Sequence, residues 1–430
     1  MPDNQRNEPA HQSFWRRLGP GLITGASDDD PSGIATYSQA GAQFGYGLLW
    51  TALFSFPLMV AIQEISARIG RITGRGIAGN IRRNFSPWVL YPIVIVLVIA
   101  NTINIGADIG AMGASLQLLV GGPALAYAAL FAVVIVVTQI YCSYRTFSNV
   151  LKWLTVVLFA YFLTPFFAHV NWKQAFAATV IPHIDWHSKE YFAMFIAVLG
   201  TTISPYLFFW QAAMEKEEVK SNPDEQPLKK DIRQARGELR RIRLDTYLGM
   251  GVSNLVAFFI VLAAAVSIHP HSTGDTINSA AEAAKALKPA VGRAAEWIFA
   301  VGIIGTGLLA VPVLAGSAAY AVGEAMKWPT GMDRKPHKAK GFYGILALST
   351  LIGFAINLPV LRINPIHALV WSAVINGVAA VPVMVVTMLL FSSKKIMGPF
   401  TRVGKLLRIV GWLATAVMAA AAVGLFVTWK

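Results

Sequence analysis

Three consecutive carboxylates, Asp28, Asp29 and Asp30, stand directly before Pro31 and between two apolar stretches. Carboxylate oxygens suit hard cations such as magnesium, calcium and manganese. In the middle of a membrane a carboxylate is costly unless it is paired or hydrated, so its presence there indicates an ion or proton path. Because close like charges disfavour one another and successive side chains point in different directions, at most one or two of the three are expected to face the same ion, and we favour Asp30, beside the proline. Asp28 and Asp29 are expected to face an inner vestibule or to cap the helix that begins at Pro31.

A second proline interrupts another apolar segment, where Pro205 stands next to Thr201, Thr202 and Ser204. Proline removes a helical hydrogen bond and clashes with the preceding turn, so both segments are expected to unwind. Unpaired backbone groups at membrane depth are tolerated only where they line protein or a water-filled cavity. Either break alone is equally compatible with an ordinary proline kink. Two breaks at matching places, with acids at one, favour the central binding site of a transporter.

The elements that position these residues are membrane helices. The chain has 430 residues, of which 55% are hydrophobic and 13% charged, and soluble domains carry about 25% charged residues. Apolar runs of about 20 residues, long enough to cross a membrane, recur along the whole length. We therefore predict an all-α integral membrane protein with eleven spans, at approximately 18–45, 47–67, 88–115, 122–142, 150–170, 191–213, 245–268, 294–325, 342–361, 366–392 and 406–428.

The distribution of basic residues predicts the orientation. The eleven spans place 29 of the 36 lysine and arginine residues on the side of the N-terminus, as the positive-inside rule expects of cytoplasmic segments. The tail 1–17 and the loop 214–244 are thus expected inside, and the C-terminus outside. The net charge of +14 mainly indicates the orientation of the chain in the membrane. Anionic lipid is a further expected contact of the basic residues, and no role for nucleic acid is expected. The loop is expected to be a solvated linker or an amphipathic helix.

Several segments resemble the Nramp family of divalent-metal transporters. They are "GPGLITGASDDDPSGIATYSQAGAQFGYGLLW" in the first span, "IQEISARIGRITGRGIA" in the second, "NIGADIGAMGASLQLL" in the third, "LGTTISPYLFFWQAA" in the sixth and "RLDTYLGMGVSNLVAFFIV" in the seventh. The resemblance implies a LeuT-like inverted repeat of five plus five helices, 18–170 and 191–392, followed by one extra helix, 406–430. It also implies that spans one and six are unwound at the midplane and hold the substrate between them.

The metal ligands that the resemblance implies are only partly present. The family's metal-binding aspartate falls on Asp30 and is kept. Its asparagine falls on Gly33, and its metal-coordinating methionine falls on Ser204. A thioether is a soft ligand that favours transition metals, whereas a hydroxyl is a hard oxygen ligand. The preference for transition metals is therefore expected to be relaxed or lost.

The residues that the resemblance links to proton movement are mostly replaced. The family's two histidines of span six fall on Tyr206 and Gln211, and neither side chain titrates near neutral pH. In span three the family's aspartate is kept as Asp108, but the glutamate three positions on is Ala111. Proton coupling is therefore expected to be weakened or absent, with Asp108 as its remnant and Asp29 as a second candidate for ion or proton coupling.

We expect a secondary transporter that moves a divalent cation resembling manganese or magnesium by alternating access. The alternative is the same scaffold moving a small anion such as bicarbonate, or another non-metal solute, with a coupled cation, since helix N-termini at the two prolines favour anions. A channel, a receptor or a membrane enzyme is the third and least favoured class, because motifs such as HExxH and GxSxG are missing. The candidate site comprises Asp30, Ser32, Gly33, Thr201, Ser204 and Tyr206, with Asp30 and Ser204 as metal ligands.

The remaining expectations concern partners and location. Coupling to H⁺ or Na⁺ is possible in either transport scheme, no cofactor is predicted, and the chain is expected to act as a monomer. Its place is the inner membrane of a bacterium, which it crosses several times. One cysteine, Cys142, excludes an internal disulfide and a site built on several cysteines.

Other polar groups have a simpler interpretation beside a functional one. His183, Asp185 and His187 alternate in an outer loop and could bind zinc, but a plain polar loop is favoured. The same holds for His269 and His271 in the next outer loop.

Two further kinds of polar residue lie in apolar helices. Glu64 and Arg68 have the spacing of a helical ion pair. Asn254 and Asn376 are expected either to hydrate a permeating ion or to join helices.

Overall fold

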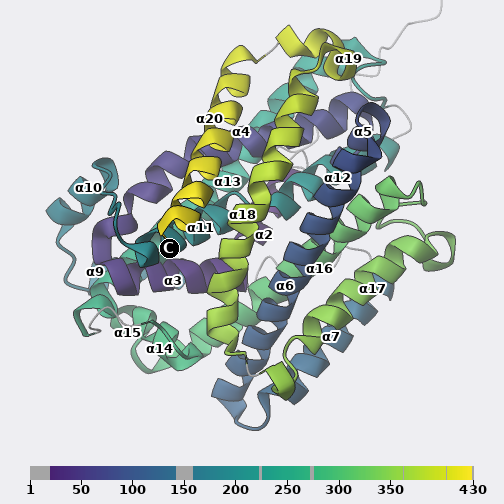
Figure 1. Cartoon of the computed structure of the whole chain (residues 1–430). Coiled ribbons are helices and arrows are strands. Elements are labelled where there is room, and N and C mark those ends of the chain that lie inside the picture. Colours follow the sequence, from purple (N-terminus) through teal and green to yellow (C-terminus); the bar gives the residue numbers. More distant parts are fainter. Residues whose placement is uncertain are drawn as a thin grey trace, which may run out of the picture.

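The architecture is helical throughout the part of the chain that the computed structural model describes, residues 20–141, 158–221, 225–271, 276–361, 363–402 and 404–428. Long helices lie side by side and inclined to one another (Figure 1), with α6, α7, α16 and α17 in mutual contact. The predicted tail 1–17, Cys142 and the first part of the expected fifth span fall outside the described residues.

The first half of the chain begins with a helix in two pieces. Its helices are α2 (Pro20–Asp28), α3 (Pro31–Phe44), α4 (Trp50–Thr73), α5 (Ile77–Asn84), α6 (Pro87–Val120), α7 (Ala124–Tyr141), α9 (Phe159–Phe167) and α10 (Trp172–Val180). A single 3₁₀ turn, Gly45–Leu48, joins α3 to α4.

The second half also begins with a helix in two pieces. Its helices are α11 (Lys189–Thr202), α12 (Pro205–Ser221), α13 (Ala235–Ser267), α14 (Ala280–Ala284), α15 (Lys288–Val291), α16 (Ala295–Ala325), α17 (Lys340–Ala355), α18 (Pro365–Ser392), α19 (Lys394–Met397) and α20 (Lys405–Thr428). Helices α12 and α13 extend into the predicted loop 214–244, so most of that loop is a continuation of the two flanking helices.

Eight helical segments of the described chain are long and apolar enough to cross a membrane. The other three predicted spans differ for separate reasons. The first is divided at Asp29, the fifth lies partly outside the described residues, and α17 is a shorter apolar helix of 16 residues. A multi-pass membrane protein is confirmed, and the count of eleven stays a prediction.

Glycines let the divided helices lie directly on their neighbours. A Cβ atom added at Gly25 of α2 would lie 2.3 Å from the backbone carbon of Gly249 in α13. A Cβ at Gly200 of α11 would lie 2.1 Å from the carbonyl oxygen of Ala373 in α18. No side chain fits at either place, so backbone packing fixes where each broken helix sits.

Candidate cation site

The first helix break is two residues long and is closed by Asp30. Helix α2 ends at Asp28 and α3 begins at Pro31, where the missing proline N–H costs no helical hydrogen bond. Asp30 has extended backbone angles, and its Oδ1 accepts a hydrogen bond from the Gly33 N–H at 2.7 Å. The cap of α3 is therefore Asp30. The expectation that Asp28 or Asp29 caps this helix is wrong, because a capping side chain must directly precede the first helical residue.

The second break also spans two residues, between the end of α11 at Thr202 and the start of α12 at Pro205. The Ser204 hydroxyl bonds back to its own helix, with the carbonyl oxygens of Gly200 at 2.9 Å and Thr201 at 2.8 Å as acceptors. A serine that donates in this way satisfies carbonyls released by the break. Its oxygen lone pairs remain the part of the side chain that can meet a cation.

The two breaks lie against each other. The Tyr37 hydroxyl of α3 is 3.1 Å from the Thr202 hydroxyl of α11. A Cβ atom at Gly33 would lie 3.0 Å from the Thr201 hydroxyl oxygen. From α12, the Tyr206 hydroxyl donates to the Ser27 carbonyl at 3.1 Å and lies 3.5 Å from Asp30 Oδ2. Four half-helices thus meet around one carboxylate.

A chain of amides connects this carboxylate to two more helices. The Asn104 Nδ2 of α6 donates a hydrogen bond to Asp30 Oδ2 at 3.0 Å, and the same nitrogen lies 3.2 Å from Asp108 Oδ2. The Asn104 Oδ1 accepts a hydrogen bond from Asn376 of α18 at 3.1 Å. Asp30 and Asp108 are 2% and 0% exposed, so both acids are shielded from bulk water.

Oxygen atoms without partners remain in this region. Among the described residues, Asp108 Oδ1, the Ser32 hydroxyl and Asn376 Oδ1 are buried and make no hydrogen bond. Buried oxygens without a donor are unfavourable unless a further group satisfies them. The unsatisfied set is dominated by hard oxygen ligands, which is the donor chemistry that suits a hard or borderline cation.

Asp28 and Asp29 are held on the other side of the break, by α13. The Ser253 hydroxyl lies 2.6 Å from Asp28 Oδ2 and 3.1 Å from Asp29 Oδ1. The two aspartates are 1% and 6% exposed. The expectation that they face an open vestibule is therefore wrong for this conformation, because α13 covers them.

The positions of the two family histidines form polar contacts between helices. Gln211 of α12 accepts a hydrogen bond from Thr24 of α2, and its Oε1 lies 3.4 Å from Gln63 Nε2 of α4. Gln63 also donates to the Leu207 carbonyl at 3.1 Å. Tyr206 and Gln211 therefore join α12 to the first broken helix with neutral groups.

The described residues do not include a metal site built from several acids, histidines or cysteines. Within the described ranges no three such side chains gather closely enough to hold a metal ion. A cation beside Asp30 would meet one or two carboxylates and otherwise neutral oxygens.

The residues of the outer histidine loops make local hydrogen bonds. Asp185 accepts the backbone N–H of His187 at 3.1 Å in an exposed turn, and the ring of His269 contacts the Ala42 carbonyl at 2.8 Å. The side chain of His271 lies outside the described residues. These contacts favour the polar-loop interpretation.

The polar residues that the sequence places in apolar helices make defined contacts. The helical ion pair between Glu64 and Arg68 is present and is confirmed. Asn254 donates to the Ala52 carbonyl at 2.9 Å and joins α13 to α4, whereas Asn376 belongs to the network of Asp30.

Sequence reasoning missed Asn104 and Ser253. Asn104 precedes Asp108 by four residues, and this helical spacing was a usable signal that the two polar groups share a face. Ser253 offered no comparable signal, since its role depends on α13 packing against α2.

Comparison with known proteins now places the chain. A sequence profile described as Nramp, natural resistance-associated macrophage protein-like, matches residues 21–428. A divalent metal cation transporter, MntH, of Acidiphilium cryptum is 27% identical over 398 residues, covering 90% of this chain and 85% of the relative. The MntH protein of Caldanaerobacter subterraneus is 24% identical over 439 residues, covering 97% of this chain and 94% of the relative.

Solved structures agree with this in fold. A mutant manganese transporter of Eremococcus coleocola has a TM-score of 0.76 at 17% identity, covering 96% of this chain and 87% of that one. MhsT bound to L-phenylalanine, a LeuT-fold transporter, has a TM-score of 0.66 at 13% identity, covering 94% of this chain and 98% of that one. The predicted LeuT-like fold is confirmed, and the MntH relatives are named as transporters rather than enzymes. The chain is a multi-pass membrane protein that belongs to the Nramp family.

Proposed function

We propose that this protein transports a divalent cation across the membrane, with Asp30 as the carboxylate that binds it. The observation that carries the proposal is the position of Asp30 between the two helix breaks, beside buried oxygens that lack a hydrogen-bond donor. The names of the relatives, divalent metal cation transporter and manganese transporter, support the same class of substrate.

The ligand set favours a harder cation than a site with a sulfur ligand would. Asp30 supplies charge, while Ser32, Thr201, Ser204 and Tyr206 carry only hydroxyl oxygens. Hydroxyl and carboxylate oxygens suit magnesium, calcium and manganese, and none of these groups is a soft ligand. We therefore propose a site with weak discrimination between manganese and magnesium.

Transport by alternating access requires the buried site to open to each side in turn. Asp30, Asp108 and Tyr206 are 2%, 0% and 0% exposed, so the helices around the breaks must move before a cation can enter. The short breaks, each two residues long, are the natural hinges. The Tyr206 contacts with Ser27 and Asp30 would have to break when α2 and α12 separate.

Coupling to protons is proposed to be weak. Tyr206 and Gln211 occupy the positions of the family's histidines and form neutral hydrogen bonds. Asp108 and Asp29 remain the acids through which a coupled H⁺ or Na⁺ could act. We also propose that the N-terminus lies in the cytoplasm of a bacterium and the C-terminus outside, and that the chain acts as a monomer of two halves, 18–170 and 191–392, plus the helix 406–430.

The anion alternative is disfavoured by one observation. The N-terminus of α3 would attract an anion, but Asp30 already occupies it by accepting the Gly33 N–H. A small anion in the same place would meet a carboxylate. A bicarbonate transporter would therefore need a cation beside the anion to screen the charge of Asp30.

Uptake by purified protein in liposomes tests the proposal. We expect saturable uptake of manganese and magnesium that is lost in Asp30→Asn and retained in Asp28→Asn, a matched change at a residue held by Ser253. Uptake of labelled bicarbonate with no uptake of manganese, magnesium or calcium would contradict it. Unitary currents without saturation would indicate a channel instead.

A further inference from the structure

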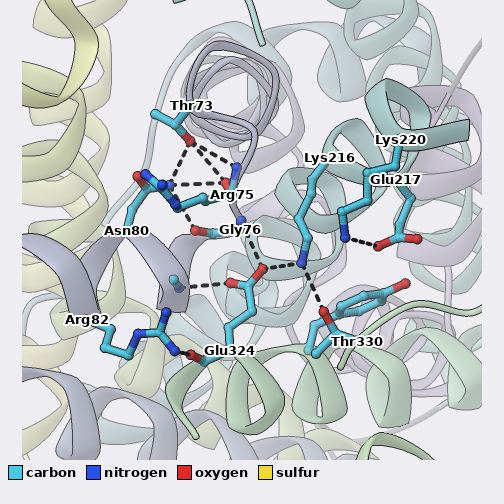
Figure 2. Close-up of polar contacts among 12 residues, drawn as sticks. Thr73, Arg75, Gly76, Asn80, Arg82, Lys216, Glu217, Lys220, Glu324 and Thr330 are labelled. Carbon is cyan, nitrogen blue, oxygen red and sulfur yellow. Dashed lines mark hydrogen bonds and ion pairs between the residues drawn. The ribbon is translucent and has the colours of Figure 1, made fainter. Parts of the chain in front are cut away.

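A polar cavity lies at the end of the molecule where α5 meets α12 and α16. It has a volume of about 220 Å³ and is lined by Arg75, Gly79, Arg82, Lys216, Glu324, Lys327, Trp328 and Thr330. Figure 2 shows the polar side chains of this region converging on Glu324. Four cations and one carboxylate line the cavity, so its charge is strongly positive.

The one carboxylate is fully engaged. Glu324 Oε1 accepts hydrogen bonds from the Gly76 N–H at 3.0 Å and from Lys216 Nζ at 2.6 Å, and Oε2 accepts the Gly79 N–H at 2.8 Å (Figure 2). Lys216 also donates to the Thr330 hydroxyl at 3.0 Å. Glu324 therefore neutralises Lys216 and the start of α5, and it leaves the other three cations without an acid.

Those three cations are Arg75, Arg82 and Lys327. Arg82 donates to the Glu324 backbone carbonyl at 2.6 Å, which carries no net charge. Within the described part of the chain, no hydrogen bond or ion pair is made by the Arg75 guanidinium or the Lys327 ammonium. Burial lowers the pKa of Arg75, and the like charges of Arg83 and Arg82 lower it further against a smaller opposing effect of Glu324. Such a cluster is stabilised by an anion.

The backbone at Lys327 adds a feature of this cation. Its φ is 62°, and no other non-glycine residue in the described ranges has a positive φ. Lys327 follows the end of α16, where the Trp328 N–H bonds to the Gly323 carbonyl at 2.8 Å. This left-handed position after a helix normally takes glycine. The chain instead has a lysine at this position, and its side chain supplies a cation on the cavity wall, which a glycine could not do.

We propose that this cavity binds a phosphate-type oxyanion through Arg75, Arg82 and Lys327. Guanidinium groups match phosphate oxygens with paired hydrogen bonds, and an ammonium adds a point charge. A free phosphate group and the headgroup of an anionic lipid share this chemistry. A lipid is accessible here because basic clusters next to membrane helices on the proposed cytoplasmic side attract anionic headgroups. Trp328, which is 41% exposed, lies at the rim as tryptophans do at membrane interfaces.

Thermal unfolding of the full-length protein in detergent micelles tests this inference. One arm compares sodium phosphate with sodium chloride at equal ionic strength, and the other compares phosphatidylglycerol with phosphatidylcholine in mixed micelles. We expect a rise in the unfolding midpoint of at least about 2 °C with phosphate or with phosphatidylglycerol. A rise with phosphate identifies a free phosphate group as a sufficient ligand, and a rise with phosphatidylglycerol alone identifies the lipid headgroup.

Three variants decide whether the rise comes from this cavity. Arg75→Gln and Lys327→Gly are expected to lose the rise in the unfolding midpoint. Lys335→Ala removes an exposed cation outside the cavity, in the same connection between α16 and α17 as Lys327, and is expected to keep the rise. Glycine fits the backbone at 327, so loss of the response in Lys327→Gly with an intact unfolding transition cannot come from misfolding. No rise in either arm, or a full rise in both cavity variants, would overturn the inference.

Discussion

Replacing Glu324 with alanine removes the carboxylate that joins α5, α12 and α16. The residue is 9% exposed, and its side chain accepts three hydrogen bonds, two from the backbone at the start of α5 and one from Lys216, a residue that is 6% exposed. The variant leaves a buried ammonium without its counter-charge and two backbone N–H groups without an acceptor. Removing one partner of a buried ion pair destabilises proteins by about 3–5 kcal/mol.

The expected loss lies at the lower end of that range. Lys216 retains the Thr330 hydroxyl at 3.0 Å and the ring of Tyr320 at 5.6 Å. These contacts partly compensate the charge, so we expect Glu324→Ala to lower the free energy of unfolding by about 3 kcal/mol. Glu324→Gln keeps one carbonyl acceptor and is expected to lose about 1–3 kcal/mol.

A double-mutant cycle with Lys216→Met measures the pair itself. The free energy of unfolding in detergent is determined for both single variants and for the double variant. We expect the double variant to be more stable than the sum of the single losses implies, with a coupling energy of about 1–3 kcal/mol. The reasoning is refuted if Glu324→Ala costs less than about 1 kcal/mol or if the two losses are additive within about 0.5 kcal/mol.

Three further changes test other parts of the account. Gly33→Ala places a Cβ 3.0 Å from the Thr201 hydroxyl oxygen and should lower the free energy of unfolding by about 1–3 kcal/mol. Gly47→Ala, whose nearest contact would be 3.7 Å away, should unfold like the native protein. Equal unfolding midpoints for the two variants would contradict this. Ser204→Met adds a soft ligand and should raise the manganese-to-magnesium uptake ratio at least about tenfold, or 1.4 kcal/mol; an unchanged ratio would exclude a role for position 204. Lys327→Gly should stabilise the unliganded fold by up to about 1 kcal/mol, and a lower unfolding midpoint would show that the backbone there is not strained.

The two helix breaks and Asp30 were predictable because their signals are local. Proline fixes where α3 and α12 begin, and Asp30 stands directly before the first proline. The same local rule would have assigned the cap to Asp30 in place of Asp28 or Asp29. Ser204 was also expected at the second break, but the direction of its hydroxyl was not. That direction depends on which carbonyls the break leaves unpaired.

The surroundings of Asp30 could not be predicted in the same way. Asn376 reaches the Asp30 network from α18, and Ser253 reaches the neighbouring Asp28 and Asp29 from α13; both helices are distant in sequence. The wrong expectation that Asp28 and Asp29 face a vestibule has the same origin, since nothing near them in the chain indicates that α13 covers them. The basic cavity combines Arg75, Lys216 and Lys327 from three separate regions, and only packing brings them together.

Calorimetric titration of the purified protein tests the central claim most directly. Manganese and magnesium are titrated into the native protein, into Asp30→Ala, and into Asp28→Asn as a change outside the proposed ligand set. We predict saturable binding of at least one cation to the native protein and to Asp28→Asn, and no detectable binding to a folded Asp30→Ala. Undiminished binding to Asp30→Ala would contradict the proposal that Asp30, between the two helix breaks, holds the transported cation.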